Sequence, residues 1–147
     1  MTQTKAALTF NLLAVLVIIF QLALALGMPW GELTWGGSFP GALPPYMRGV
    51  CVVSALLLTA FVGVVSVRAG LLLPGLQNTS RKLIWVVVAY SALGVVANII
   101  TPSFWERVVW LPMALGLFVS SFVVARKLSI QKGGHLVDDD RPEMLGR

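Results

Sequence analysis

Long apolar stretches alternate with short polar segments along the chain. Residues free of Asp, Glu, Lys and Arg run over 6–28, 49–67, 83–105 and 108–125. An apolar stretch of about 18 residues or more is long enough to cross the hydrocarbon core of a bilayer as a helix. The pattern therefore predicts an all-α integral membrane protein, a four-helix transmembrane bundle. We place its spans at about 6–28, 49–67, 83–101 and 105–125.

Lysine and arginine residues lie mostly on one side of this predicted bundle. Nine of them flank the spans on that side: Lys5, Arg68, Arg81, Lys82, Arg126, Lys127, Lys132, Arg141 and Arg147. Only Arg48 and Arg107 lie on the other side. Because short cytoplasmic loops carry the excess of Lys and Arg, both termini are predicted to be cytoplasmic. The pI of about 10 is then explained by the Lys and Arg residues that set the orientation of the bundle in the membrane. Nucleic acid is not expected as a partner, since no basic stripe with interleaved aromatics is present.

The segments outside the spans are too short to form a separate soluble domain. We therefore expect residues 1–147 to be a single membrane domain, with an outer cap loop at 29–48 and a cytoplasmic tail at 126–147. Only 12% of the residues are charged, about half the share found in soluble globular domains. The lipid bilayer is the partner that this composition requires.

The predicted outer loop combines turn-forming residues with apolar ones. Four glycines and four prolines between positions 29 and 45 promote turns. Because the same loop is rich in apolar side chains, we expect it to fold down as a cap over the outer end of the bundle. Tryptophan is enriched at the interface between membrane and water. The candidate interfacial aromatics are Trp30, Trp35, Trp105 and Trp110.

Four charged residues gather on the predicted outer face: Glu32, Arg48, Glu106 and Arg107. Both arginines lie near helix N-termini, where the helix dipole disfavours a cation, so each should seek an anionic partner. We expect ion pairs that pin the cap to the bundle, such as Glu32 with Arg107. An anion or lipid-headgroup site at the two arginines is the alternative. Catalysis by the two carboxylates is a third interpretation, and no catalytic residue is assigned.

A short turn joins the third and fourth spans, so these helices are predicted to form an antiparallel hairpin. Ser103 and Glu106 have the spacing of a capping box, in which each side chain bonds the backbone amide of the other residue. At the start of the third span, Thr79 or Ser80 is the expected N-cap.

Three amide side chains lie within the spans: Asn11, Gln21 and Asn98. Gln21 and Asn98 each lie about 15 residues from the inner start of their span, which places both at a depth of about 22 Å. They can therefore meet in the outer half of the bundle. Hydrogen bonding across helices is the expected role of such groups. Lining a small polar cavity beneath the cap is the alternative.

Few residues are suited to metal, redox or nucleophilic chemistry. Cys51 is the single cysteine and excludes an internal disulfide. His135 is the single histidine, and a structural metal site normally needs about four ligands. We therefore predict no metal and no cofactor.

The outer-face residues resemble those of a family of small bacterial four-span membrane proteins of unknown function. The matching residues are Gly27-Met28-Pro29-Trp30-Gly31, Trp35-Gly36-Gly37, Pro40-Gly41, Leu43-Pro44, Arg48, Asn98, Thr101-Pro102-Ser103, Glu106-Arg107 and Pro112. The resemblance covers about residues 26–112. It implies a bacterial cytoplasmic membrane and supplies no reaction, ligand or partner.

Two classes of function compete on this pattern. The first is a non-enzymatic accessory protein that binds a membrane-protein partner or a lipid. The second is a small transporter or channel, which would need a homo-oligomer to enclose a path. Against it, no charged residue lies at mid-membrane depth, where coupled transport commonly depends on one. A membrane enzyme acting at the outer interface, with Glu32 and Glu106 as its acids, is the third interpretation.

Overall fold

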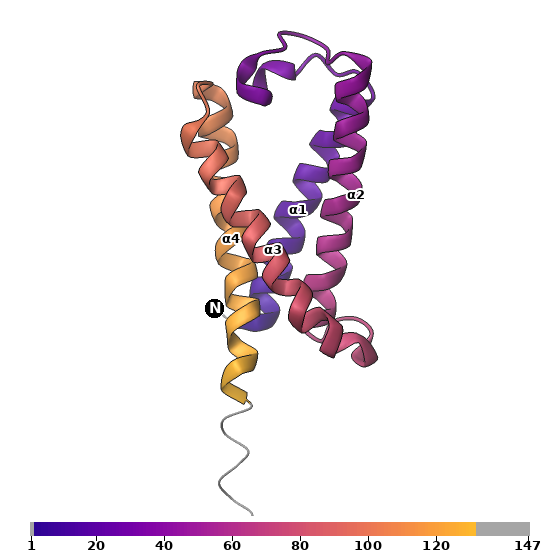
Figure 1. Cartoon of the computed structure of the whole chain (residues 1–147), viewed down its shortest axis with the longest axis vertical. Coiled ribbons are helices and arrows are strands. Elements are labelled where there is room, and N and C mark those ends of the chain that lie inside the picture. Colours follow the sequence, from indigo (N-terminus) through magenta and orange to yellow (C-terminus); the bar gives the residue numbers. More distant parts are fainter. Residues whose placement is uncertain (1, 132–147) are drawn as a thin grey trace, which may run out of the picture.

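The described residues form four long helices and three short 3₁₀ turns, which Figure 1 shows. The computed structural model describes residues 2–131, so the predicted tail from 132 onward, including His135, lies outside the described residues. The helices are α1 (Gln3–Ala25), α2 (Pro45–Arg68), α3 (Gln77–Ile100) and α4 (Phe104–Gln131). The 3₁₀ turns are η1 (Gly31–Leu33), η2 (Trp35–Gly37) and η3 (Pro74–Leu76).

All four helices are long and apolar enough to cross a membrane. Their outward faces are strongly apolar. Leu12, Leu56 and Leu93 are each more than 60% exposed. A contiguous apolar surface of this extent is unfavourable in water and requires a nonpolar solvent. The predicted all-α, four-helix membrane fold is therefore confirmed, and the chain is a multi-pass membrane protein.

The helices pack tightly at one end of the bundle and diverge at the other. We call the end that carries the α2–α3 connection the basic end, and the end that carries residues 26–44 the cap end. A core formed by all four helices fills the basic half, and includes Phe10, Phe61, Val65, Ile84 and Val124. Toward the cap end, the α1–α2 pair leans away from the α3–α4 pair (Figure 1).

A glycine in the left-handed conformation follows the C-cap residue of both α1 and α2. Gly27 has φ 99° and Gly70 has φ 74°. In α1 the Gly27 amide donates to the Leu24 carbonyl, and the next amide donates to the Ala23 carbonyl. This pair of bonds is a Schellman motif, which satisfies carbonyl groups left free at the helix end.

Two of the expected helix caps differ from the structure. The helix α3 begins at Gln77, so Thr79 and Ser80 lie inside it, and the Ser80 hydroxyl donates to the Gln77 carbonyl. At α4 the Ser103 hydroxyl accepts from the Glu106 amide as predicted. The predicted reciprocal bond, from the Ser103 amide to the Glu106 carboxylate, is wrong. The carboxylate accepts from the Gly36 amide of the cap instead.

An amide side chain joins α1 to α2 within the membrane span. Asn11 Nδ2 donates to Ser66 Oγ over 2.9 Å. Asn11 Oδ1 is buried without a hydrogen-bond partner among the described residues. Cross-helix bonding is therefore seen at Asn11, whereas Asn98, for which it was predicted together with Gln21, bonds within its own helix.

We expect Ser66→Ala to lower the free energy of unfolding by about 1 kcal/mol, because it leaves the Asn11 amide without its acceptor. The matched control is Ser91→Ala, since the Ser91 hydroxyl is also buried but bonds within its own helix, to the Val87 carbonyl. Unfolding in detergent measures both. An equal loss in the two variants would contradict a cross-helix role for Asn11.

Candidate functional site beneath the cap

The cap, residues 26–44, is a folded structure with its own small core. Leu43 is almost fully buried and packs with Leu24, Met47 and Cys51 from the adjoining ends of α1 and α2. Across the cap, the amide of Gly31 donates to the carbonyl of Gly41 over 2.9 Å. The apolar composition of the loop therefore serves to seat it on the α1–α2 pair.

Hydrogen bonds attach the other side of the cap to the α4 segment. Glu106 Oε2 accepts from the Gly36 amide over 2.7 Å. Trp110 Nε1 donates to the Leu33 carbonyl over 2.6 Å. The Ser103 hydroxyl donates to the backbone carbonyl of Glu32 over 3.4 Å. The cap thus bridges the two helix pairs at the end where they diverge.

The structure gives Glu32 and Arg107, which were predicted to form an ion pair, separate contacts. The Glu32 side chain is exposed, and its backbone carbonyl rather than its carboxylate contacts the α4 segment. Arg107 donates to the Thr101 carbonyl over 2.6 Å. Glu106 accepts from the Thr101 hydroxyl as well as from the cap. The charged side chains of Glu106 and Arg107 form hydrogen bonds with backbone and hydroxyl groups. The turns of the cap and of residues 101–103 place those groups within reach.

The side chain of Arg48, at the start of α2, lies beside the C-terminal end of α1. Its Nε donates to the Leu43 carbonyl over 2.8 Å. Its guanidinium lies over Gly27, where an added Cβ would be 3.2 Å from an Nη atom. Gly27 directly follows the C-terminal end of α1, the negative end of that helix dipole. The cation at the start of α2 is therefore stabilised by the end of α1.

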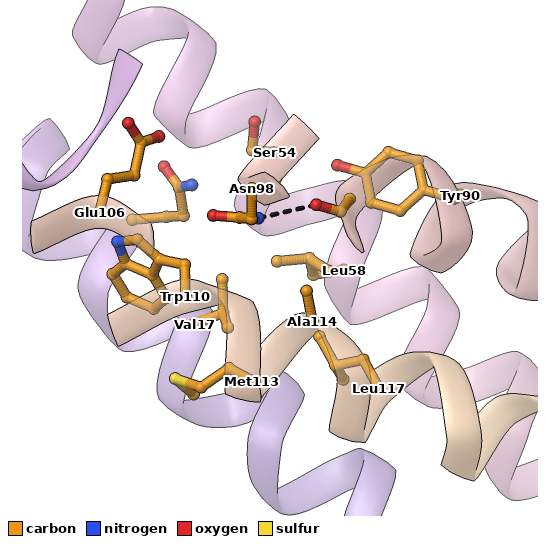
Figure 2. Close-up of a pocket in the computed structure, with 12 residues that line it drawn as sticks. Val17, Ser54, Leu58, Tyr90, Asn98, Glu106, Trp110, Met113, Ala114 and Leu117 are labelled. Atoms are coloured by element: carbon orange, nitrogen blue, oxygen red, sulfur yellow. Dashed lines mark hydrogen bonds between the residues drawn. The ribbon is translucent and has the colours of Figure 1, made fainter. Parts of the chain in front are cut away.

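A pocket of about 190 Å³ lies among the four helices next to these cap contacts. Its lining residues are Val17, Gln21, Ser54, Leu58, Tyr90, Gly94, Asn98, Glu106, Trp110, Met113, Ala114 and Leu117. Figure 2 shows the labelled polar groups of Glu106, Ser54, Asn98 and Tyr90 along one side, and Met113 and Leu117 along the other. The pocket is amphipathic, and two of its residues, Glu106 and Trp110, also hold the cap.

The structure brings Gln21 and Asn98 to this same pocket. Asn98 Nδ2 donates to the Gly94 carbonyl of its own helix over 2.8 Å (Figure 2). The amide oxygen of Asn98 and the second N–H of its nitrogen are therefore left to meet a ligand. Sequence reasoning missed Ser54, Tyr90 and Gly94. Gly94 lies one helical turn before Asn98, and that spacing is the signal that was available.

The four predicted interfacial tryptophans have different environments. Trp35 and Trp105 are 46% and 64% exposed. Trp30 is also exposed on one face, and its ring stacks on Phe20 with a centroid distance of 6.1 Å. Trp110 is half-buried and lines the pocket, with its ring 4.4 Å from that of Phe20. Trp110 is therefore part of the pocket wall.

Comparison with protein-family models, with curated proteins and with solved structures found no match to this chain. The family resemblance of the cap residues stays a prediction.

Proposed function

We propose that this protein is a non-enzymatic membrane protein that binds a single-chain amphiphile in the pocket beneath the cap. The observation that carries the proposal is the pocket itself, which has polar groups along one side, from Glu106 beside the cap to Tyr90 near the middle of α3, and apolar groups along the other side (Figure 2). A cytoplasmic location of the termini and a bacterial cytoplasmic membrane belong to the same proposal. A membrane-protein partner or a homo-oligomer stays a prediction.

The acceptors in the pocket favour a headgroup that donates hydrogen bonds. Both hydrogen bonds to Glu106 end on Oε2, so Oε1 is the oxygen left for a ligand. Asn98 adds a second acceptor, because its amide oxygen is separate from the nitrogen that donates to the Gly94 carbonyl. A carboxylate acceptor in a nonpolar setting attracts an ammonium or hydroxyl group and repels a second carboxylate. The expected headgroup is therefore an amine or an alcohol.

The size of the pocket limits how much of the ligand it holds. Sites for drug-sized molecules enclose about 300–1,000 Å³, and this pocket encloses about 190 Å³. The headgroup and the first part of a chain fit, and the rest of the chain would leave between the helices into lipid. The side chains of Val17, Met113 and Leu117 supply the apolar wall for that chain.

The packing of the basic half supports binding more than passage. Large side chains from all four helices fill that half, including Phe10, Phe61 and Ile84. In the described residues, the pocket beneath the cap is bounded below by this core. The enzyme interpretation gains no support from the geometry, because the pocket lining includes Glu106 and does not include Glu32.

Filling the pocket should abolish binding. Gly94 lines the pocket, and a Cβ added there meets nothing within 4 Å, so Gly94→Leu should be accommodated and should occupy the pocket. We expect dodecylamine and dodecanol to raise the unfolding temperature of the wild type in maltoside detergent, and dodecanoate to raise it much less. Gly94→Leu should lose at least about tenfold in apparent affinity for dodecylamine, since about 1.4 kcal/mol corresponds to tenfold.

Gly63→Leu is the matched control, because Gly63 is a helical glycine with open space around it and lies outside the pocket lining. It should bind dodecylamine like the wild type. Equal binding by Gly94→Leu and the wild type would contradict the proposal. Equal stabilisation by dodecanoate and dodecylamine would contradict the assigned headgroup.

A further inference from the structure

Arg68, the last residue of α2, is a buried cation with no acidic residue beside it among residues 2–131. It is only 7% exposed. Its Nε is buried and has no hydrogen-bond partner among the described residues. A buried charge is normally paired and hydrogen-bonded, because it has lost its hydration. Within the part of the chain that the structure describes, the side chain therefore lacks an anion.

A second pocket, of about 520 Å³, surrounds this side chain at the basic end. Its lining residues are Arg68, Asn78, Arg81, Lys82, Trp85 and Ala125. They come from the end of α2, the first turns of α3 and the last part of α4. Two separate helices, α2 and α3, thus bring three cations and one amide to one concave site, and α4 adds the apolar side chain of Ala125.

The described residues supply no negative charge at this site. Between residues 2 and 131 the acidic side chains are Glu32 and Glu106, which lie at the cap end. The start of α3 adds positive potential, since its N-cap residue, Leu76, makes no side-chain hydrogen bond to the free amides of the first turn. The described part of the pocket therefore carries positive charge only.

We propose that this basic pocket binds a phosphate group. Arginine matches phosphate through several parallel hydrogen bonds, and an amide donor and a helix N-terminus complement the same anion. Trp85 is 50% exposed beside the cations, in the manner of a side chain at headgroup depth. The phosphate of an anionic lipid and a soluble phosphate share this chemistry. The inference is independent of the amphiphile pocket, which lies at the other end of the molecule.

The test uses the full chain in maltoside detergent, which contains no phosphate. Phosphatidic acid, inorganic phosphate and oleate, an anion without phosphate, are titrated separately while the unfolding temperature is followed. We expect stabilisation by a phosphate-bearing probe and much less by oleate. Selective stabilisation by phosphatidic acid assigns a lipid headgroup, and equal stabilisation by inorganic phosphate assigns a soluble ligand.

Arg68→Gln should weaken the apparent affinity for the stabilising probe about tenfold or more, since it removes a charge-assisted donor. It should fold, because it relieves a buried charge. Arg126→Gln is the matched control. Arg126 lies at the same end and is exposed, with its guanidinium 4.9 Å from the Phe122 ring centroid, and it is not part of the pocket lining. Its substitution should change the affinity by less than about threefold.

Equal effects of the two substitutions would show general electrostatic attraction and overturn the proposal. Stabilisation by oleate as strong as by phosphatidic acid would do the same. The acidic triplet Asp138–Asp140 is the rival occupant within this chain. Destabilisation by Asp138→Asn, Asp139→Asn and Asp140→Asn together, with no stabilisation of the wild type by either phosphate probe, would assign Arg68 to that segment and overturn the proposal.

Discussion

Gly31→Ala should unfold the cap and lower the free energy of unfolding by about 3 kcal/mol, the upper part of the usual range for overpacking. A Cβ at this position would lie closer than 3.0 Å to the carbonyl oxygens of Phe39 and Gly41. These are backbone atoms, which cannot move aside as the end of a side chain can. Separating them would also break the bond from the Gly31 amide to the Gly41 carbonyl. Unfolding in detergent measures the loss.

Gly49→Ala is the control for that experiment. Gly49 lies in the first turns of α2, and an added Cβ there meets nothing within 4 Å. Alanine has the higher helix propensity, so this variant should be as stable as the wild type or more stable. If Gly31→Ala unfolded at the same temperature as Gly49→Ala, the close packing of the cap backbone would be refuted.

Glu106→Ala should release the cap from α4 and destabilise the protein by about 2–4 kcal/mol. The substitution leaves the Gly36 amide and the Thr101 hydroxyl without their shared acceptor. Hydrogen bonds to a charged group contribute about 1.5–3 kcal/mol each, and two that end on one oxygen are not fully additive. Glu106→Gln should lose less, because its amide oxygen still accepts one bond. Hydrogen exchange of the Gly36 amide should accelerate in step with the loss.

Glu32→Ala is the matched acid control, because the Glu32 side chain is exposed and is not the group that holds the cap. It should leave stability and the exchange of the Gly36 amide nearly unchanged. Slow exchange of that amide in Glu106→Ala would show that the cap is held by other contacts. The pair also tests the proposed function, since losing the carboxylate should weaken dodecylamine binding while Glu32→Ala should not.

The sequence was sufficient to predict the four helices and the folded cap. Both follow from composition. A helix that crosses a bilayer core must be long and free of charged residues, and an apolar loop rich in glycine and proline folds against the bundle. The ends of the helices were less predictable. Polar residues such as Gln77 and Asn78 continue α3 beyond its apolar part, and apolarity carries no information about where a backbone leaves the helix.

The partners of the charged residues could not be predicted from charge alone. Matching two Glu with two Arg predicted ion pairs, whereas Glu106 and Arg107 bond the backbone or a hydroxyl group. Such partners depend on the path of a turn, which the side-chain sequence does not specify. Arg68 was interpreted as an orientation signal for a similar reason, because its burial arises only when α3 and α4 pack beside the end of α2.

The contact of Arg48 with Gly27 has a consequence for the order in which the molecule assembles. This contact and the hydrogen bond from Arg48 to the Leu43 carbonyl join the two ends of the cap. They need only residues that belong to α1, the cap and the first turn of α2. Closing this short loop carries a small entropic penalty. During synthesis the cap can therefore fold once α2 has been made. Its hydrogen bonds to Ser103, Glu106 and Trp110 form only after α3 and α4 have been made.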